Sequence, residues 1–311
     1  MASRLIPLLL AGCAFAAIGC GGAGAHGSRA DAGGTTAAAA LRADAGGTTA
    51  AAGSRADAGG TTAAAASRAD AGGTTAAAGS RAAATRAHIW AVGDSAGGAH
   101  AAAVARLIRR HRPDRVLYLG DIYNGASGFR AFKRLYGHTR VARTPGNHDW
   151  PHYWSGTEWY SFKAGGWRII ELNSETSHGG KQLAWLRRQL RARGDCRLAF
   201  WHRPRYSAGL HGDNRDMDPY WRALEGHARL VVSGHDHDMQ RFAPRGTLTQ
   251  LVAGAGGRSH YRVNRQRAAL AFADDRDWGA LRVDLSRGRA EVRFVTTSGR
   301  TVDAHTVTCQ P

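Results

Sequence analysis

Short apolar runs, separated by glycine and polar residues, begin after residue 85 and continue to the C-terminus. Residues 88–94 form the first run, which indicates a buried strand and ends on Asp94. Residues 98–111 then place apolar side chains at the spacing of an amphipathic helix. Residues 115–121 repeat the strand pattern and end on Asp121. This alternation of strand and helix signals predicts an α/β fold.

Later strand signals also end at polar residues, two of which are His202 and His235. In open α/β sheets, ligands bind at the carboxyl ends of the strands, so these positions are candidates for function. The further elements that we predict are strands over residues 141–144, 167–173, 197–202 and 229–235, and a helix over residues 181–193.

From residue 247 onward the helix signals are few, and alternating runs such as residues 281–285 and 290–294 replace them. Strict alternation is typical of strands with one buried face. We therefore expect a second sheet, formed by this C-terminal stretch and packed on the first. The predicted fold is an αββα sandwich, two mixed sheets flanked by helices, over residues 87–311.

The first 20 residues have the pattern of an export signal, with Arg4 before apolar residues 5–10 and small residues after them. Residues 10–13 and, less closely, residues 17–20 resemble the lipobox of bacterial lipoproteins, in which the cysteine is acylated. Cys13 and Cys20 are therefore alternative lipidation sites. An uncleaved membrane anchor is the other alternative, but the apolar stretch is shorter than the roughly 20 residues that span a bilayer.

These features predict an exported protein of the cell envelope or extracellular space, attached to the membrane by an N-terminal lipid. Structural disulfides persist in such compartments. Cys196 and Cys309 are the only cysteines of residues 87–311, and we expect a disulfide between them.

Residues 21–86 are of low complexity. A 13-residue block rich in Ala, Gly and Thr starts at residues 28, 41, 54 and 67. Leu41 is the only large apolar residue in the blocks, which leaves almost nothing to bury, and the glycines interrupt any helix. We predict a disordered tether between the signal and the folded domain.

The formal net charge of +18 raises the question of nucleic-acid binding. Residues 1–79 contain five Arg and four Asp, so the net charge belongs almost entirely to the rest of the chain. Its arginines are scattered, with no basic run interleaved with stacking aromatic residues. We expect no specific nucleic-acid binding, although a basic surface concentrates anionic phosphate esters.

Five short segments carry the candidate chemistry because acids, an amide and histidines follow glycine or a strand end. Two metal ions ~3.5–4 Å apart need several oxygen and imidazole ligands and one carboxylate that touches both ions. Glycine allows the sharp turns that direct such side chains into one cavity. The segments are residues 93–94, 120–123, 146–149, 201–202 and 234–237.

In this order the segments resemble the calcineurin-like metallophosphoesterases, and more narrowly the purple acid phosphatases. In the wider family a His often stands two residues after the first Asp, where this sequence has Ala96. Purple acid phosphatases lack that His and place a Tyr three residues after the second Asp. Tyr123 is the counterpart here, although it stands only two residues after Asp121.

The resemblance implies two metal ions, drawn from Fe, Zn and Mn, that share Asp121 as a bridging ligand. It assigns Asp94, Asp121, His237 and Tyr123 to the first ion. It assigns Asn147, His202, His235 and again Asp121 to the second ion.

The resemblance also implies hydrolysis of phosphate esters, with a metal-bound hydroxide as the nucleophile. We expect His148 to act as general acid, with Asp149 as its orienting partner; the alternative is that His148 only hydrogen-bonds the phosphoryl oxygen. Arg203 and His211 are candidate substrate-binding residues.

An exported phosphomonoesterase similar to acid phosphatases is the predicted function. Phosphodiesterase activity on nucleotides or lipid head groups is one alternative. A catalytically inactive, metal-containing surface binding module is the alternative of another class.

Overall fold

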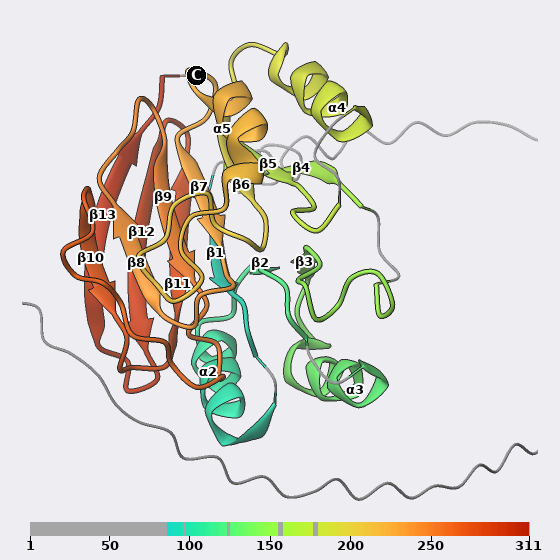
Figure 1. Ribbon diagram of the computed structural model, residues 1–311, viewed down its shortest axis with the longest axis vertical. Coiled ribbons are helices and arrows are strands. Elements are labelled where there is room, and N and C mark those ends of the chain that lie inside the picture. Colours follow the sequence, from blue (N-terminus) through green and yellow to red (C-terminus); the bar gives the residue numbers. More distant parts are fainter. Residues whose placement is uncertain (1–85, 96, 123–124, 155–157, 177–179, 311) are drawn as a thin grey trace, which may run out of the picture. The chain divides into compact units, whose positions relative to one another are not determined.

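The computed structural model describes residues 86–95, 97–122, 125–154, 158–176 and 180–310 (Figure 1). These residues all belong to one compact unit, Ala69–Pro311. The predicted signal segment, residues 21–85 of the predicted tether and the lipidation sites Cys13 and Cys20 lie outside the described residues, whereas Arg86, the last residue of the predicted tether, begins the first strand. Among the residues that are described, no helix combines the length and the apolar character needed to cross a bilayer.

One sheet has six strands in the order β13-β12-β11-β1-β2-β3. Strands β1, β2 and β3 run parallel, whereas β11 pairs with β1 antiparallel and continues through β12 to β13. Helix α2 (Gly98–Arg110) connects β1 to β2, and α3 (Gly125–Tyr136) connects β2 to β3. The strands are β1 (Arg86–Val92), β2 (Arg115–Tyr118), β3 (Val141–Arg143), β11 (Gly279–Ser286), β12 (Arg289–Thr296) and β13 (Thr301–Thr308).

The other sheet has seven strands in the order β10-β8-β9-β7-β6-β5-β4, of which β5, β6, β7 and β9 run parallel. Helix α4 (Lys181–Leu190) precedes β6, and the short helices η1 (Arg215–Met217) and α5 (Asp218–Leu224) precede β7. The strands are β4 (Tyr160–Ala164), β5 (Trp167–Glu171), β6 (Cys196–Phe200), β7 (Leu230–Ser233), β8 (Met239–Phe242), β9 (Thr249–Ala253) and β10 (Leu270–Asp274).

Strand alternation divides the apolar side chains among three layers of core. In β1, Ile89 and Ala91 pack between the two sheets, whereas Trp90 and Val92 pack beneath α2 and α3. A third cluster fills the space between the seven-stranded sheet and helices α4 and α5. In Figure 1, α2 and α3 lie together on one side and α4 and α5 on the other. The predicted αββα sandwich of two mixed sheets is therefore confirmed.

The composition of the second sheet was predicted wrongly. Strands β11, β12 and β13 do not form a separate sheet: they extend the first one, through antiparallel pairing in which Ile89 faces Val283. Only β9 and β10 of the C-terminal stretch join the other sheet, beside β7 and β8. Local alternation reveals that a segment is a strand, but it contains no information on which distant strand is its partner.

The predicted disulfide between Cys196 and Cys309 is present, with a Cα–Cα distance of 5.8 Å. Cys196 begins β6 in one sheet, and Cys309 follows β13 in the other. The bond therefore joins the two layers and fastens the C-terminal tail to the body of the domain.

Replacing both cysteines by serine is expected to lower the free energy of unfolding by about 4 kcal/mol, because the bond closes a loop with a sequence separation of 113 residues. Denaturant unfolding in the absence and presence of a reducing agent measures this effect. The reductant should destabilise the natural chain and leave the double variant unchanged. Equal sensitivity of both proteins would contradict the assignment.

Glu171, the last residue of β5, is fully buried. Trp167 and Ile169, four and two positions earlier, pack between the sheets, so strand alternation turns Glu171 to the same side. Burial raises the pKa of the Glu171 carboxyl well above its usual range. The folded protein thus retains a proton that the unfolded chain releases.

The stabilisation that this proton gives is complete below 4.5, the pKa of Glu171 in the unfolded chain. It is lost as the pH rises toward and through the pKa of Glu171 in the folded protein. Glu171→Gln keeps the shape without the titration. We expect it to raise the free energy of unfolding by on the order of 1 kcal/mol or more at pH 8, with little change at pH 4. Denaturant titrations at both pH values measure the difference, and a Gln variant that is less stable at pH 8 would contradict the prediction.

Candidate metal centre

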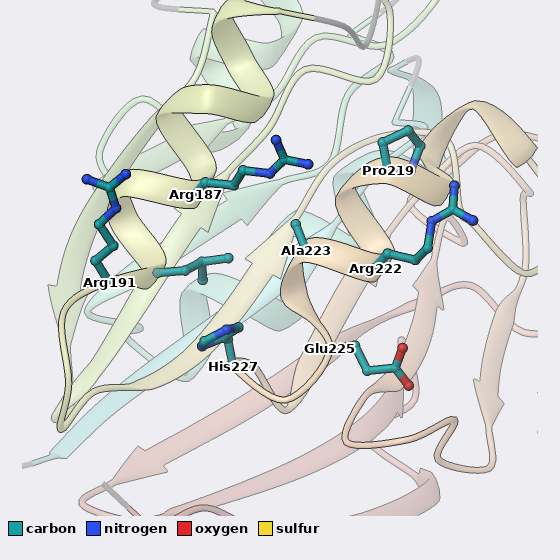
Figure 2. Close-up of a pocket in the computed structure, with 8 residues that line it drawn as sticks. Arg187, Arg191, Pro219, Arg222, Ala223, Glu225 and His227 are labelled. Atoms are coloured by element: carbon teal, nitrogen blue, oxygen red, sulfur yellow. The ribbon is translucent and has the colours of Figure 1, made fainter.

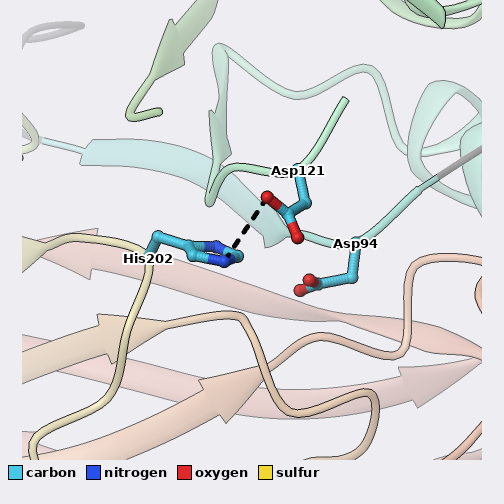
Figure 3. Close-up of side chains that lie close together, drawn as sticks. All are labelled: Asp94, Asp121 and His202. Carbon is cyan, nitrogen blue, oxygen red and sulfur yellow. Dashed lines mark ion pairs between the residues drawn. The ribbon is translucent and has the colours of Figure 1, made fainter. Parts of the chain in front are cut away.

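The candidate ligands gather where strands of both sheets end. Asp94 follows β1 and Asp121 follows β2, while His202 and His235 follow β6 and β7 of the other sheet. Figure 3 shows Asp94, Asp121 and His202 converging from three separate segments. One potential ligand atom of each of these three residues lies within 4.8 Å of the other two.

Left-handed backbone conformations aim several of these side chains. Asp94, Asp121 and His235 have φ angles of 61°, 59° and 72°, which residues other than glycine rarely adopt. The backbone turns sharply at each strand end and directs the side chain into the common cavity. Such local strain is typical of functional sites that the surrounding structure holds in place.

Close packing around Asp121 requires glycine at a neighbouring position. A Cβ atom on Gly146 would lie 2.0 Å from Asp121 Oδ1. The glycine before Asn147 therefore allows the loop after β3 to approach the loop after β2.

One half of the centre contains four potential ligand atoms. His202 Nε2 lies 3.1 Å from Asn147 Oδ1, 3.1 Å from His235 Nδ1 and 3.5 Å from Asp121 Oδ1. Asp121, His202 and His235 are buried, and Asn147 is half-buried. The structure thus brings together the whole set that was predicted for the second ion.

The other half contains Asp94 and His237. Asp94 Oδ1 lies 3.7 Å from His237 Nε2, while Asp94 Oδ2 accepts a hydrogen bond from the backbone N–H of His235 at 2.9 Å. Asp94 is completely buried, and its Oδ1 has no hydrogen-bond partner among the described residues. Burial, followed by the charge of Asp121, raises the pKa of the Asp94 carboxyl well above its usual range.

Backbone carbonyls define the tautomers of two histidines. His202 Nδ1 lies 2.7 Å from Leu119 O, and His237 Nδ1 lies 2.8 Å from Ser259 O. Because a carbonyl oxygen only accepts, each Nδ1 carries the proton, and each Nε2 presents a lone pair to the centre. Burial lowers the pKa of His237 to about 4 and that of His235 much further, so both rings are neutral at pH 7.

The imidazole lone pair of His237 Nε2 thus faces Asp94 Oδ1 at 3.7 Å, a separation too long for a hydrogen bond, within a set of imidazole, carboxyl and amide groups. A cation satisfies such a set, since oxygen and imidazole are suitable ligands for Fe, Zn and Mn. The residues present therefore fit metal binding in both halves. The assignment of Tyr123 as a ligand lies outside the described residues.

Asp149 has a role that the sequence did not indicate. Its carboxylate accepts hydrogen bonds from three backbone N–H groups, those of Asp121 at 2.7 Å, Ile122 at 2.8 Å and Gly146 at 3.0 Å. Buried Asp149 therefore connects the loop after β2 to the loop after β3. Its predicted orienting of His148 stays a prediction.

His148 lies at the exposed rim of the centre. Its backbone N–H donates to Asp121 Oδ1 at 3.0 Å, which places the residue directly beside the predicted bridging carboxylate. That position is compatible with a proton donor at the open side of the site.

Both predicted substrate-binding residues lie against His235. Arg203 Nη1 is 3.2 Å from His235 Nε2, and its Nε donates to both carboxylate oxygens of Glu175, at 3.1 and 2.9 Å. The His211 ring stacks on His235 with a centroid distance of 4.0 Å. His211 Nδ1 lies 3.0 Å from Asp236 Oδ1, so a buried acid orients this exposed ring.

Three residues that contact candidate site residues were not predicted as functional: Glu175 beside Arg203, Asp236 beside His211, and Tyr261, whose ring stacks on His237. Asp236 lies between two predicted ligands, and that adjacency is a sequence signal for it. Glu175 and Tyr261 belong to segments without a recognisable motif. Their proximity to the centre becomes evident only in the folded chain.

A basic groove between α4 and α5 is separate from the metal centre (Figure 2). It has a volume of about 590 Å³, and none of the predicted ligands lines it. Its lining includes Arg187, Arg191 and Arg222, which agrees with the scattering of arginine over helix surfaces.

Comparisons with known proteins agree with this arrangement. The family model of the calcineurin-like phosphoesterases matches residues 87–239. The GAP50 anchor of the inner membrane complex of Plasmodium has a similar structure, with a TM-score of 0.62 and 16% identity over 73% of this chain and 90% of that one. A search of the curated proteins gave no match.

Two enzymes have similar folds. The purple acid phosphatase PPD1 of yellow lupin gives a TM-score of 0.61 at 15% identity over 72% of this chain, which spans about half (54%) of that one. A dimetal phosphatase of Danio rerio gives 0.53 at 15% identity over 71% of this chain and 98% of that one. At such identities the likeness concerns the fold.

Asp121→Asn is expected to reduce metal binding by at least 10-fold, because the substitution removes charge from the position shared by both halves. Metal content after dialysis and calorimetric titration with Zn²⁺ or Mn²⁺ measure the effect. Asp216→Asn, the same change at an exposed position, is the matched control. Unchanged stoichiometry and affinity in the Asp121 variant would exclude Asp121 as a shared ligand.

Proposed function

We propose, on the premise that the chain belongs to the calcineurin-like phosphoesterase family through residues 87–239, that it hydrolyses phosphate monoesters at a centre of two metal ions. One observation carries the proposal: potential ligand atoms of six residues converge from both sheets in two groups beside Asp121. The six are Asp94, Asp121, Asn147, His202, His235 and His237.

In this proposal Asp94, Asp121 and His237, with Tyr123, hold one ion, and Asn147, His202 and His235, with Asp121, hold the other. When bound, the ions supply positive charge for the phosphoryl oxygens and acidify a water molecule. The ligand types leave the choice among Fe, Zn and Mn open. The narrower likeness to purple acid phosphatases supports the proposal through the sequence motif and through the fold of the lupin enzyme.

The remaining groups of the chain position the ester and move a proton. Arg203 is held by Glu175 beside His235, so its guanidinium lies at the edge of the centre, where a phosphoryl oxygen can accept from it. His211, oriented by Asp236, lies on the face of the same imidazole. His148 at the exposed rim donates a proton to the leaving oxygen.

A binding module without turnover is the second candidate function. The observation that favours it is the similarity to GAP50, the anchor in the inner membrane complex of Plasmodium. The six converging ligand residues and the oriented His211 favour the enzyme.

Export and lipid attachment complete the proposal. The signal-like residues 1–20, with Cys13 and Cys20, support it from the sequence, and the Cys196–Cys309 disulfide is a feature of oxidising compartments. The tether would then let the domain act at the outer surface of a membrane.

Hydrolysis of p-nitrophenyl phosphate beside bis(p-nitrophenyl) phosphate tests the reaction, with metals removed by chelation and restored singly. We expect metal-dependent turnover that favours the monoester by at least 10-fold. A preference for the diester would indicate a phosphodiesterase and contradict the proposed phosphomonoesterase activity. A folded protein that binds two ions and turns over neither ester would support the binding module.

His148→Ala is expected to lower kcat by about 100-fold for an alkyl phosphate, and by less for p-nitrophenyl phosphate, whose leaving group needs little protonation. Metal content should be unchanged. His152→Ala, a nearby exposed histidine, is the matched control. An equal loss for both esters would contradict the role of proton donor, and loss of metal would make His148 a ligand.

A further inference from the structure

The segment between β9 and β10 is fastened to the metal centre by its backbone. The N–H of Arg258 donates to Asp94 O at 3.1 Å, and Ser259 O lies 2.8 Å from His237 Nδ1. The next residue, His260, has its Nδ1 2.8 Å from His237 O. Three successive residues therefore contact two predicted ligands, and the position of the residue that follows them is closely defined.

That residue is Tyr261, whose ring packs against the histidines of the centre. It stacks on His237 with a centroid distance of 4.1 Å and an interplanar angle of 17°. Its edge meets His211 at 5.1 Å and 76°. His211 in turn stacks on His235 at 4.0 Å. Tyr261 and His211 thus form a second layer of rings over two ligand imidazoles.

The hydroxyl of Tyr261 is available for a ligand. Tyr261 is half-buried, and no hydrogen bond of its hydroxyl occurs within the described parts of the chain. The stacking on His237 and the edge contact with His211 place this O–H donor beside the centre.

We propose that Tyr261 is a further substrate-binding residue, whose hydroxyl donates a hydrogen bond to the phosphoryl group of the ester at the metal centre. Its ring, supported by His237 and His211, forms the wall of the site on that side. The inference rests on the proposed function for the identity of the ester. The chemistry recognised is that of a tetrahedral phosphate oxyanion, whether an ester or inorganic phosphate.

Tyr261→Phe tests this assignment because it removes the hydroxyl and keeps the ring that stacks on His237. Calorimetric titration of the metal-loaded full chain with inorganic phosphate measures the effect without turnover. We expect the dissociation constant to rise by roughly 10-fold to 100-fold, the range for loss of a hydrogen bond to a charged group, with a similar fall in kcat/KM. Metal content and the unfolding midpoint should remain those of the natural chain.

Tyr206→Phe is the matched control, since the Tyr206 ring packs against Trp221 and Phe242, away from the ligands. It should leave phosphate affinity unchanged. Phosphate affinity in Tyr261→Phe equal to that of the natural chain would overturn the proposal. Loss of metal, or loss of a visible charge-transfer band from the iron-loaded protein, would also overturn it by making Tyr261 a metal ligand.

The two proposals fail separately. Phosphate binding that weakens in Tyr261→Phe, in a protein that hydrolyses no ester, supports the Tyr261 site and removes the enzymatic function. Turnover that persists in Tyr261→Phe, with unchanged phosphate affinity, removes the Tyr261 site and supports the enzymatic function.

Discussion

Two buried carboxylates, those of Asp94 and Asp121, lie close together at the meeting point of the two sheets. Burial destabilises the charged form of Asp94, and the charge of Asp121 adds to the effect. The neighbouring imidazoles of His202 and His237 donate their Nδ1 protons to backbone carbonyls, so their Nε2 lone pairs face the carboxyl groups. A cation bound between these groups would supply positive charge and leave these hydrogen bonds intact.

The supports of these groups are mostly backbone contacts. The carboxylate of Asp149 connects two ligand loops through three N–H groups, and Leu119 and Ser259 supply the carbonyls that orient His202 and His237. Left-handed φ angles at three ligand positions persist because this network over-determines them. A centre held in this way keeps its geometry before any ion or substrate arrives, which lowers the reorganisation needed on binding.

Around the ligands lies a second group of side chains with a different purpose. Arg203 with Glu175, His211 with Asp236, and Tyr261 on His237 each combine a group at the centre with a partner that holds it. They place a cation, an imidazole and a phenol on adjoining sides of the same histidines. Hydrogen-bond donors of this kind suit an oxyanion with several equivalent oxygens, such as the phosphoryl group of the proposed substrate.

The sequence by itself determined the α/β class, the positions of the candidate ligand residues at strand ends and the cysteine pair. These features are local, because the period of two in a strand and the turn after it are encoded by adjacent residues. Tyr123, Cys13 and Cys20 stay predictions from sequence, as do the signal and the tether. Pairing of β11 with β1, the three amides on Asp149 and the stacking of Tyr261 on His237 were decided by the tertiary structure. Each joins residues far apart in the chain, and such contacts depend on how whole layers pack, which no local pattern of residues specifies.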